Sequence, residues 1–365
     1  MPSEDYFKYC KSLRTFPAIQ APLSPAEQEA KYKTLLSIET AETQRATEQI
    51  RTSLDLQALR DTASKVQGQI CAGIYHIAHG GYNQVFIVTF EDGSDVIARV
   101  NGSYAGYDDK VTPEAVAHRM ESEYATMTLV LRRTSIPVAR ILFIASDGTN
   151  AVHSPYTLQT RIIGRPLHEI WPALDISADS QLSAAQMEAV VRQVAHIEGQ
   201  LMQTTFDSIG SLIRDQRSGD IKVSTMGISK AHNYPLMGNI MVANDDPSRI
   251  VGVVDWEGAR VVPLWASYFS TPFLGKGMYV GDDPDLLDRL LDIRRKIHVS
   301  MQPALEHVEE ATSGLRALWY IANRPSMFHT PPNVLGALEH FLRSRPQDDA
   351  RLFVQTIRLG YSVCK

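Results

Sequence analysis

The residues best able to bind a metal ion lie in one segment near position 240. Asn239 enters the apolar run 240–242, and Asp255 leaves a second apolar run, 250–254. If these runs pair as a hairpin around the turn at 244–248, an amide oxygen and a carboxylate lie side by side at one end of it. Mg²⁺ takes few protein oxygens and leaves the rest of its octahedron to water and phosphate. The segment therefore predicts a Mg²⁺ site, although a turn Asn and a capping Asp produce the same pattern.

A glycine turn and an arginine on a nearby strand could bind phosphate. Gly80 and Gly81 separate two β-rich runs, so they suit a strand–turn–strand and not the strand-to-helix turn of a dinucleotide fold. Such a turn can lay backbone N–H groups over phosphates, although an ordinary hairpin turn has the same sequence. Arg99 stands in the next apolar run, 95–100. The alternation of that run leaves open whether the Arg99 side chain faces solvent or the cleft under the turn.

Glu123 is predicted to lie on the apolar face of a helix. Thr112 and Pro113 supply a cap and a first-turn proline, and apolar residues then recur at spacings of three and four up to about Leu131. A carboxylate on that face needs a partner of opposite charge, unless it lies at the edge of the stripe and reaches water. We expect Arg99 to be the partner and to present the paired donors of its guanidinium fork to Glu123.

The elements that must position these residues divide the chain into three parts. Residues 1–68 carry apolar positions at helical spacing, which predicts a helical N-terminal extension. Residues 69–165 hold short β-rich runs between turn residues, with one main helix among them, which predicts a lobe built on an antiparallel sheet. Residues 166–365 favour a mostly helical lobe that also carries the hairpin with Asn239 and Asp255. The order of elements predicts an α+β fold.

Local patterns make this prediction more specific. Asp92–Gly93 is a strong hairpin signal between the second and third β-rich runs. The segments 136–144 and 156–163 indicate two further strands. Ser183–Gln186 has the pattern of a capping box, and the apolar residues after it form one face of a helix.

Composition and charge exclude several classes of protein. The chain has 365 residues, 44% of them hydrophobic and 21% charged, which is typical of a globular protein. A formal net charge of −5 provides no cationic field for nucleic acid, so nucleic acid is not the expected partner, and a small ligand or a protein fits better. Of these, we expect a small-molecule substrate. No window approaches the roughly 20 apolar residues that span a bilayer, and no signal-peptide pattern is visible, so we expect a cytoplasmic protein without a membrane partner. The three cysteines are widely separated, which supports neither a disulfide framework nor a zinc site.

Several ordered motifs between about Ile74 and Leu274 together resemble the aminoglycoside phosphotransferase family, and in particular its fungal branch of kinase-like small-molecule phosphotransferases. The motifs are the turn at 80–83, Ile97–Val100, Glu123–Met127, Thr134–Pro137, Ile163–Leu167, Phe206–Leu212 and Val254–Glu257 with Pro263. The resemblance implies a protein-kinase-like two-lobed α+β fold, with ATP and Mg²⁺ as cofactors.

The resemblance also implies a role for each candidate residue. The glycine turn with Gly80, Gly81 and Asn83 would cover the phosphates of the nucleotide, and Arg99, braced by Glu123, would anchor them. Gln159 and Arg161 would lie in the linker beside the adenine. Asn239 and Asp255 would bind Mg²⁺.

The catalytic loop departs from the family pattern, which reads His, any residue, Asp, then four residues and Asn. This chain keeps His232 and Asn239 but has Tyr234 where the catalytic Asp belongs. A phenol with a reference pKa near 10 is a poor proton acceptor at neutral pH. The segment between Leu212 and His232 is also much shorter than the family's usual insertion, which helps to wall the acceptor site. The candidate catalytic set is therefore His232, Tyr234, Asn239 and Asp255, although His232 could simply hold its loop by a hydrogen bond.

Two classes of function fit these residues. One is an ATP- and Mg²⁺-dependent phosphotransferase that acts on a small hydroxylated molecule, with its activity reduced by Tyr234. The other is a kinase-fold protein that no longer transfers phosphate, either a nucleotide-binding pseudokinase or a repurposed enzyme of secondary metabolism that performs acid–base chemistry such as cyclisation or isomerisation. The fold alone does not separate them, because function resides in the site.

Overall fold

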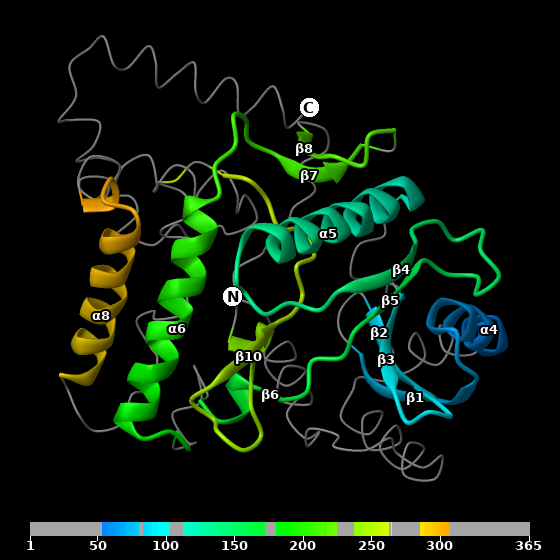
Figure 1. Ribbon diagram of the computed structural model, residues 1–365, viewed down its shortest axis with the longest axis horizontal. Helices are drawn as coiled ribbons and strands as arrows, with labels where there is room; N and C mark the ends of the chain where they lie inside the picture. Colours follow the sequence, from blue (N-terminus) through cyan, green and yellow to red (C-terminus); the bar gives the residue numbers. More distant parts are fainter. Residues whose placement is uncertain are drawn as a thin grey trace, which may run out of the picture.

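The computed structural model describes residues 53–79, 83–102, 112–171, 180–215, 217–224, 237–262, 264 and 285–306. Figure 1 shows their arrangement. In chain order the elements are α4 (Leu56–Gln67), β1 (Cys71–His79), β2 (Asn83–Phe90), β3 (Asp95–Asn101), α5 (Pro113–Arg133), β4 (Ile141–Ala145), β5 (Tyr156–Gln159), β6 (Arg165–Pro166), η2 (Leu167–Glu169), α6 (Ala184–Gln203), β7 (Ser211–Arg214), β8 (Ile221–Ser224), η3 (Met237–Asn239), β9 (Ile240–Val242), β10 (Ile250–Val253) and α8 (Leu286–Met301).

The first part of the structure is a five-stranded sheet in the order β1-β2-β3-β5-β4, with antiparallel pairing throughout. Alternate residues of β3 point to opposite faces of the sheet. Ala98 and Val100 point toward α4, where they share a hydrophobic core with Leu59 and Ala63 of that helix. The other face of the sheet is therefore left for α5 and for the side chains that matter to the site.

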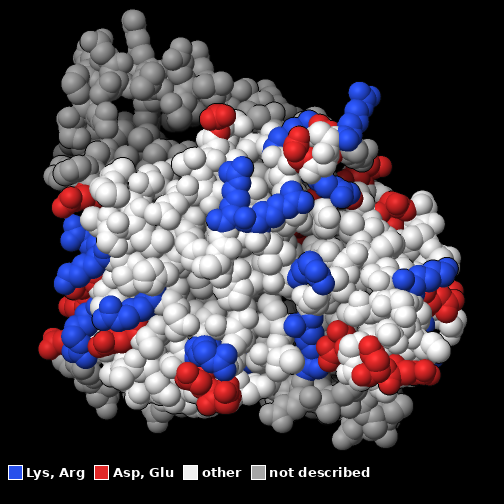
Figure 2. Space-filling view, viewed as in Figure 1, with Lys and Arg blue, Asp and Glu red and all other residues white. Residues whose placement is uncertain are grey.

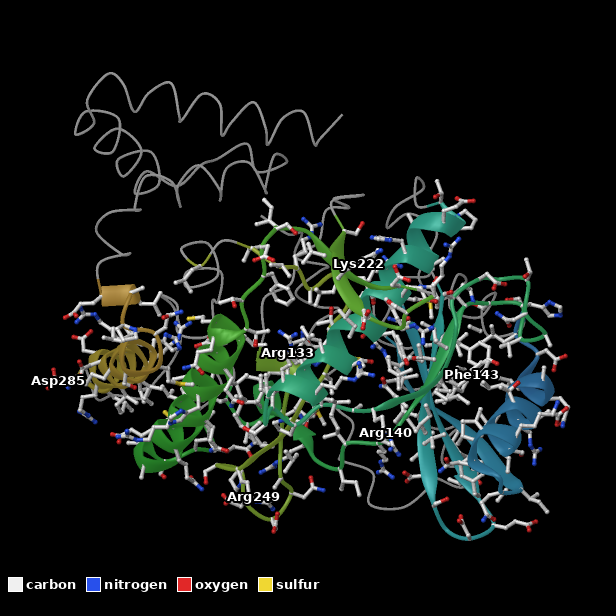
Figure 3. The ribbon with its side chains drawn as sticks, turned by 45° about the horizontal axis from the view of Figure 1, so that its top comes forward. Arg133, Arg140, Phe143, Lys222, Arg249 and Asp285 are labelled. Carbon is white, nitrogen blue, oxygen red and sulfur yellow. The ribbon has the colours of Figure 1, made fainter. Side chains whose placement is uncertain are left out.

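Helix α5 is held on two flanks. Met127 and Val130 pack with Val253 of β10 and with Trp256 just after it. Leu129, on another side of the helix, packs against Leu212 of β7, and the β7–β8 hairpin lies along the helix (Figure 1). In Figure 3, Lys222 marks this hairpin and Arg133 marks the last turn of α5. The β7–β8 hairpin is not apparent from the sequence pattern.

The second part of the structure centres on α6 and α8, which pack side by side (Figure 1). The predicted capping box at Ser183 and Gln186 is present, and it begins α6. The core between the helices and the small sheet β10-β9-β6 includes the fully buried Trp171. The antiparallel sheet with one main helix and the helical second part confirm the predicted α+β fold class.

Two predicted strands differ from the observed ones. The segment 136–144 enters the sheet only at Ile141, because the residues before Ile141 pair with β10 instead. The N–H of Val253 donates to the carbonyl of Pro137 at 2.8 Å, and Val138 forms a parallel bridge with Val253. The segment 156–163 leaves the sheet after Gln159, and the chain then runs toward β6, which pairs with β9.

Several predictions fall on residues outside the described ranges. These include most of the helical extension 1–68, of which only the part from residue 53 is described, and the helical stretches beyond residue 306. Among the described residues, no helix combines the length and apolar character needed to cross a membrane.

A buried ion-pair cluster joins α6 to α8. The Glu198 carboxylate accepts hydrogen bonds from Arg294 Nε at 2.8 Å and Nη2 at 2.9 Å, and it lies 3.0 Å from His298 Nε2. The side chain of Glu198 is only 3% exposed. Burial by itself would raise the pKa of Glu198, but Arg294 and His298 outweigh that effect, so the pKa is lowered.

We expect Glu198→Gln to lower the free energy of unfolding by about 3–5 kcal/mol at pH 7, because it leaves a buried cation without its partner. A lowered carboxyl pKa contributes stability above the unfolded value of about 4.5, and this contribution is lost as pH falls below it. The difference between wild type and variant should therefore shrink on acidification, as measured by urea unfolding at pH 7 and pH 4.

Glu188→Gln is the matched control, since Glu188 also bridges α6 and α8, 3.9 Å from Arg289, but with 32% of its side chain exposed. It should change the free energy of unfolding by less than about 1 kcal/mol. Equal losses in the two variants would show that burial of the cluster is irrelevant.

Candidate functional site

Arg99 faces the α5 side of the sheet. Its neighbours Ala98 and Val100 point into the core beneath α4, so the alternation of β3 directs Arg99 to the opposite face. There it lies opposite Val85 of β2 and Thr157 of β5. The orientation that the sequence leaves open is thus decided by which face α4 covers.

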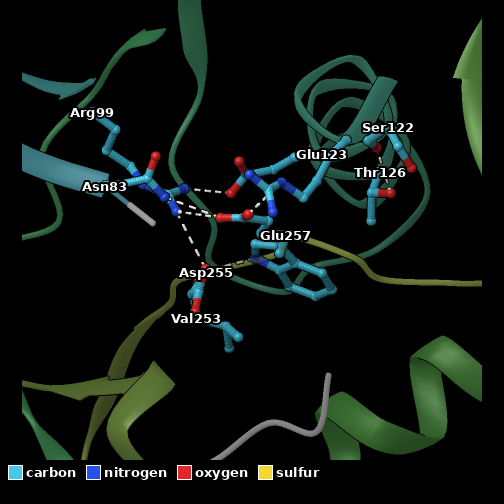
Figure 4. Close-up of polar contacts among 10 residues, drawn as sticks. Asn83, Arg99, Ser122, Glu123, Thr126, Val253, Asp255 and Glu257 are labelled. Atoms are coloured by element: carbon cyan, nitrogen blue, oxygen red, sulfur yellow. Dashed lines mark hydrogen bonds and ion pairs between the residues drawn. The ribbon is translucent and has the colours of Figure 1, made fainter. Parts of the chain in front are cut away.

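Arg99 and Glu123 form the predicted ion pair, with Arg99 Nη1 donating to Glu123 Oε1 (Figure 4). The Glu123 side chain is buried, with 7% of its surface exposed. The predicted fork on a single carboxylate is wrong, because the second terminal nitrogen, Nη2, donates instead to Asp255 Oδ1 at 3.2 Å. Burial would lower the pKa of Arg99, but the surrounding carboxylates raise it, and the net shift is upward.

Helix α5 can deliver Glu123 because its start and its register are both determined. Thr112 Oγ1 accepts from the N–H of Ala115 at 3.2 Å, and Pro113 occupies the first turn, as the sequence predicts. Arg119 lies one helical turn before Glu123, so the two side chains emerge from the same face. This one face therefore presents a cation and an anion to the rest of the site.

The β9–β10 hairpin brings Asn239 and Asp255 to one end. Ile240 pairs with Val253, and the carbonyl of Asn239 accepts from the N–H of Val254 at 2.9 Å. Asp255 follows with a φ of 61°, a left-handed conformation that Asp and Asn tolerate better than other non-glycine residues. Its side chain is 47% exposed, so its carboxylate remains accessible even while it contacts Arg99.

This donor set suits a hard cation that is completed by other oxygens. Among the described residues, no group of three or more His, Cys, Asp or Glu side chains is arranged to hold a metal. One amide oxygen from Asn239 and one carboxylate from Asp255 would leave most of an octahedron to water and phosphate, which is how Mg²⁺ is commonly bound beside nucleotides. The residues therefore fit Mg²⁺ together with a phosphate ligand.

Glu257 is a member of the site that sequence reasoning missed. Its Oε1 lies 2.6 Å from Arg119 Nε, and its Oε2 accepts from Asn83 Nδ2 at 3.0 Å. Arg99 Nη2 lies 3.8 Å from Oε2. Burial raises the pKa of Glu257 to about 7, against the lowering effect of Arg119. The only signal in the sequence was its place in the motif Asp255-Trp-Glu257.

Gln159 and Arg161 have different surroundings. Gln159 lies opposite Ile97, on the sheet face that carries Arg99, and its buried Oε1 forms no hydrogen bond within the described residues. Arg161 instead pairs with Asp95 at the start of β3, with Nη1 2.5 Å from Oδ2. The structure thus places Gln159 on the site face and Arg161 in an ion pair. Their roles beside an adenine remain predictions.

The remaining candidates lie partly outside the described residues. Gly80, Gly81, His232 and Tyr234 are all outside, so their predicted roles remain predictions. Asn83, the last residue of the glycine motif, is described and begins β2, where its side chain binds Glu257.

Comparisons with known proteins give matches to fungal sequences and to phosphotransferase structures. No family profile matches the chain. It is 29% identical over 217 residues to a subtelomeric hrmA-associated cluster protein of Aspergillus fumigatus, covering 58% of this chain and 38% of that protein. It is 30% identical over 143 residues to altered inheritance of mitochondria protein 9, mitochondrial, of Candida tropicalis, covering 39% of this chain and 22% of that protein. The matched part is thus less than half of each relative's length.

Two solved structures also match. A putative fructosamine-3-kinase of Thermobifida fusca has a TM-score of 0.43 at 12% identity, covering 78% of this chain and 99% of that one. A macrolide 2'-phosphotransferase of Brachybacterium faecium has a TM-score of 0.41 at 14% identity, covering 80% of this chain and 99% of that one.

The two carboxylates bound to Arg99 should differ in their contribution to stability. We expect Glu123→Gln to lower the free energy of unfolding by about 3–5 kcal/mol, because it removes the buried partner of a buried cation. Asp255→Asn should cost less than about 1 kcal/mol, since Asp255 is half exposed and Asn also tolerates the left-handed backbone. Urea unfolding of both variants measures the difference, and a larger loss for Asp255→Asn would contradict this account of the site.

Proposed function

We propose that this protein is a phosphotransferase that binds ATP with Mg²⁺ and transfers phosphate to a small hydroxylated molecule, with turnover limited by Tyr234. The observation that carries this proposal is the arginine held between two carboxylates from distant parts of the chain: Arg99 of β3 contacts Glu123 of α5 and Asp255 after β10. A cation with one buried and one accessible partner can keep the first and bind a phosphate in addition to, or instead of, the second.

Each residue of the site has a role that its surroundings support. Glu123 would keep the Arg99 guanidinium directed into the site when a phosphate binds, since its contact with Arg99 is buried. Asp255, being accessible, would exchange part of its contact with Arg99 for a metal ion, with Asn239 as the neighbouring ligand. The bound Mg²⁺ would neutralise charge on the transferring phosphoryl group. Gln159 would lie beside the base, on the same face of the sheet.

The distribution of charge argues against nucleic acid as the partner. The net charge is −5, and Figure 2 shows acidic and basic side chains interspersed over one face of the molecule. A polyanion such as nucleic acid requires a continuous basic surface. A compact substrate needs only local cations such as Arg99.

A second candidate function is favoured by one specific observation, the Tyr at position 234. Without a carboxylate there, the acceptor hydroxyl lacks the usual proton acceptor. The same site would then serve a substrate whose chemistry uses a phenol as acid or base, for example a cyclisation. The two functions share the fold and differ in whether phosphate is transferred.

We expect MgATP to raise the melting temperature of the wild type, because a ligand bound only by the native state stabilises it by mass action. At a ligand concentration 100 times Kd, the gain in free energy of unfolding is about 2.7 kcal/mol. Asp255→Asn should remove the part of the shift that depends on Mg²⁺, measured as the difference between MgATP and ATP with a chelator. Asp245→Asn is the control, because it removes an exposed carboxylate from the turn of the same hairpin. Asp245 lies beside Arg249, which is labelled in Figure 3. This variant should leave the shift in melting temperature unchanged. A wild type that shows no shift at millimolar MgATP would contradict the proposed nucleotide binding.

Tyr234→Asp should raise ATP turnover, since general-base assistance typically contributes about 10²–10⁴-fold. The gain should appear in kcat and not in nucleotide affinity, as measured by ADP formation with a panel of hydroxylated acceptors. Tyr234→Phe is the control, because it removes the phenol hydroxyl without adding a carboxylate and should leave ADP formation at the wild-type level. Background ADP formation in all three folded proteins would favour the second candidate function.

A further inference from the structure

Glu257 connects three elements of the first part of the structure to the end of the β9–β10 hairpin. One carboxylate oxygen meets Arg119 of α5 at 2.6 Å, and the other accepts from Asn83 of β2 at 3.0 Å and lies 3.8 Å from Arg99 of β3. The Glu257 side chain is 12% exposed. Both of its oxygens are thus occupied by protein donors, in contrast to the accessible carboxylate of Asp255.

The segment that carries Glu257 is itself held firmly. Trp256 is buried, and its indole Nε1 donates to the carbonyl of Val253 at 3.0 Å. The carbonyl of Trp256 in turn accepts from the N–H of Ala259 at 3.1 Å. Because residues on both sides of Glu257 are anchored, its carboxylate offers a fixed point to the groups that bind it.

The charges around this fixed point alternate. Glu123 contacts Arg99, Arg99 lies between Asp255 and Glu257, and Glu257 contacts Arg119 (Figure 4). Arg119 and Glu123 are four residues apart on α5, so the ion pair between Arg119 and Glu257 constrains the rotation and the axial position at which Glu123 reaches Arg99. Asn83 begins β2, so its hydrogen bond to Glu257 holds the start of that strand.

We propose that Glu257 is a positioning residue of the phosphate site, which acts through Arg119 and Asn83 and does not bind the metal ion. This inference rests on the proposed function. Neutralising Glu257 would release α5 and the start of β2 together, so Arg99 would lose its preset orientation while the metal ligands Asn239 and Asp255 remained in place.

The test compares Glu257→Gln, Arg119→Met, the double variant and Arg119→Lys at pH 8. Dissociation constants are measured by calorimetry for MgATP and for ATP with a chelator, and the half-saturating Mg²⁺ concentration is measured at fixed ATP. We expect each single variant to weaken ATP binding by about 5- to 30-fold with and without Mg²⁺, and the double variant to weaken it no further. Arg119→Lys should recover part of the affinity, since it keeps the charge. Arg132→Met, which removes an exposed arginine from the last turn of the same helix, should bind as the wild type does.

Two results would overturn the proposal. A selective increase in half-saturating Mg²⁺ in Glu257→Gln, without a matching effect in Arg119→Met, would make Glu257 a metal ligand. Unchanged affinity in both variants, even with lowered melting temperatures, would make the cluster merely structural. If Glu257→Gln does not fold, Arg119→Met removes the same contact from the other side and should still weaken ATP binding.

Hydrogen exchange of the ligand-free protein separates this proposal from the proposed function. In both Glu257→Gln and Arg119→Met, amides of α5 and of the first residues of β2 should exchange faster than in the wild type, while those of α8 should not change. If the wild type binds no MgATP but this pattern appears, the linkage stands and the proposed ligand is wrong. If the pattern is absent, the linkage itself is wrong.

Discussion

The structure of the site depends on one buried cation and the need to neutralise it. Arg99 extends from the middle of a sheet into a region shielded from water, where an unpaired charge would be costly. Its partners come from opposite directions: Glu123 from the helix that crosses this face, and Asp255 from the end of a hairpin in the second part of the chain. A single guanidinium therefore links the sheet, the helix and the hairpin.

This linkage requires α5 to be held accurately, and the surrounding elements provide that support. The helix packs on Val253 and Trp256 along one flank and on Leu212 of β7 along another, while Arg214 lies over the ring of Tyr124, 4.8 Å from its centroid. Because Tyr124 adjoins Glu123, the β7–β8 hairpin bears on the residue that braces Arg99. The short segment between Leu212 and His232 thus includes a support for α5.

The same physical solution appears between α6 and α8, where Glu198 binds Arg294 and His298 in a buried cluster. Both clusters join elements that are far apart in the sequence. They differ in accessibility: the Glu198 cluster is closed, whereas Asp255 leaves one side of the Arg99 cluster open to a ligand. That difference separates a structural ion pair from one that can do chemistry.

The sequence by itself determined the features that depend on a few neighbouring residues: the cap and first turn of α5, the capping box of α6, and the hairpin that brings Asn239 beside Asp255. It predicted Glu123 as the partner of Arg99, but the packing of α4 on one face of the sheet decided that Arg99 faces α5. Tertiary structure alone decided that the Arg99 guanidinium is divided between two carboxylates and that Glu257 binds Asn83 and Arg119. The contact between Arg99 and Asp255 spans 156 positions, and that between Asn83 and Glu257 spans 174. No local periodicity carries information over such distances, because the choice of partner depends on which faces of the sheet and of α5 are covered by other elements.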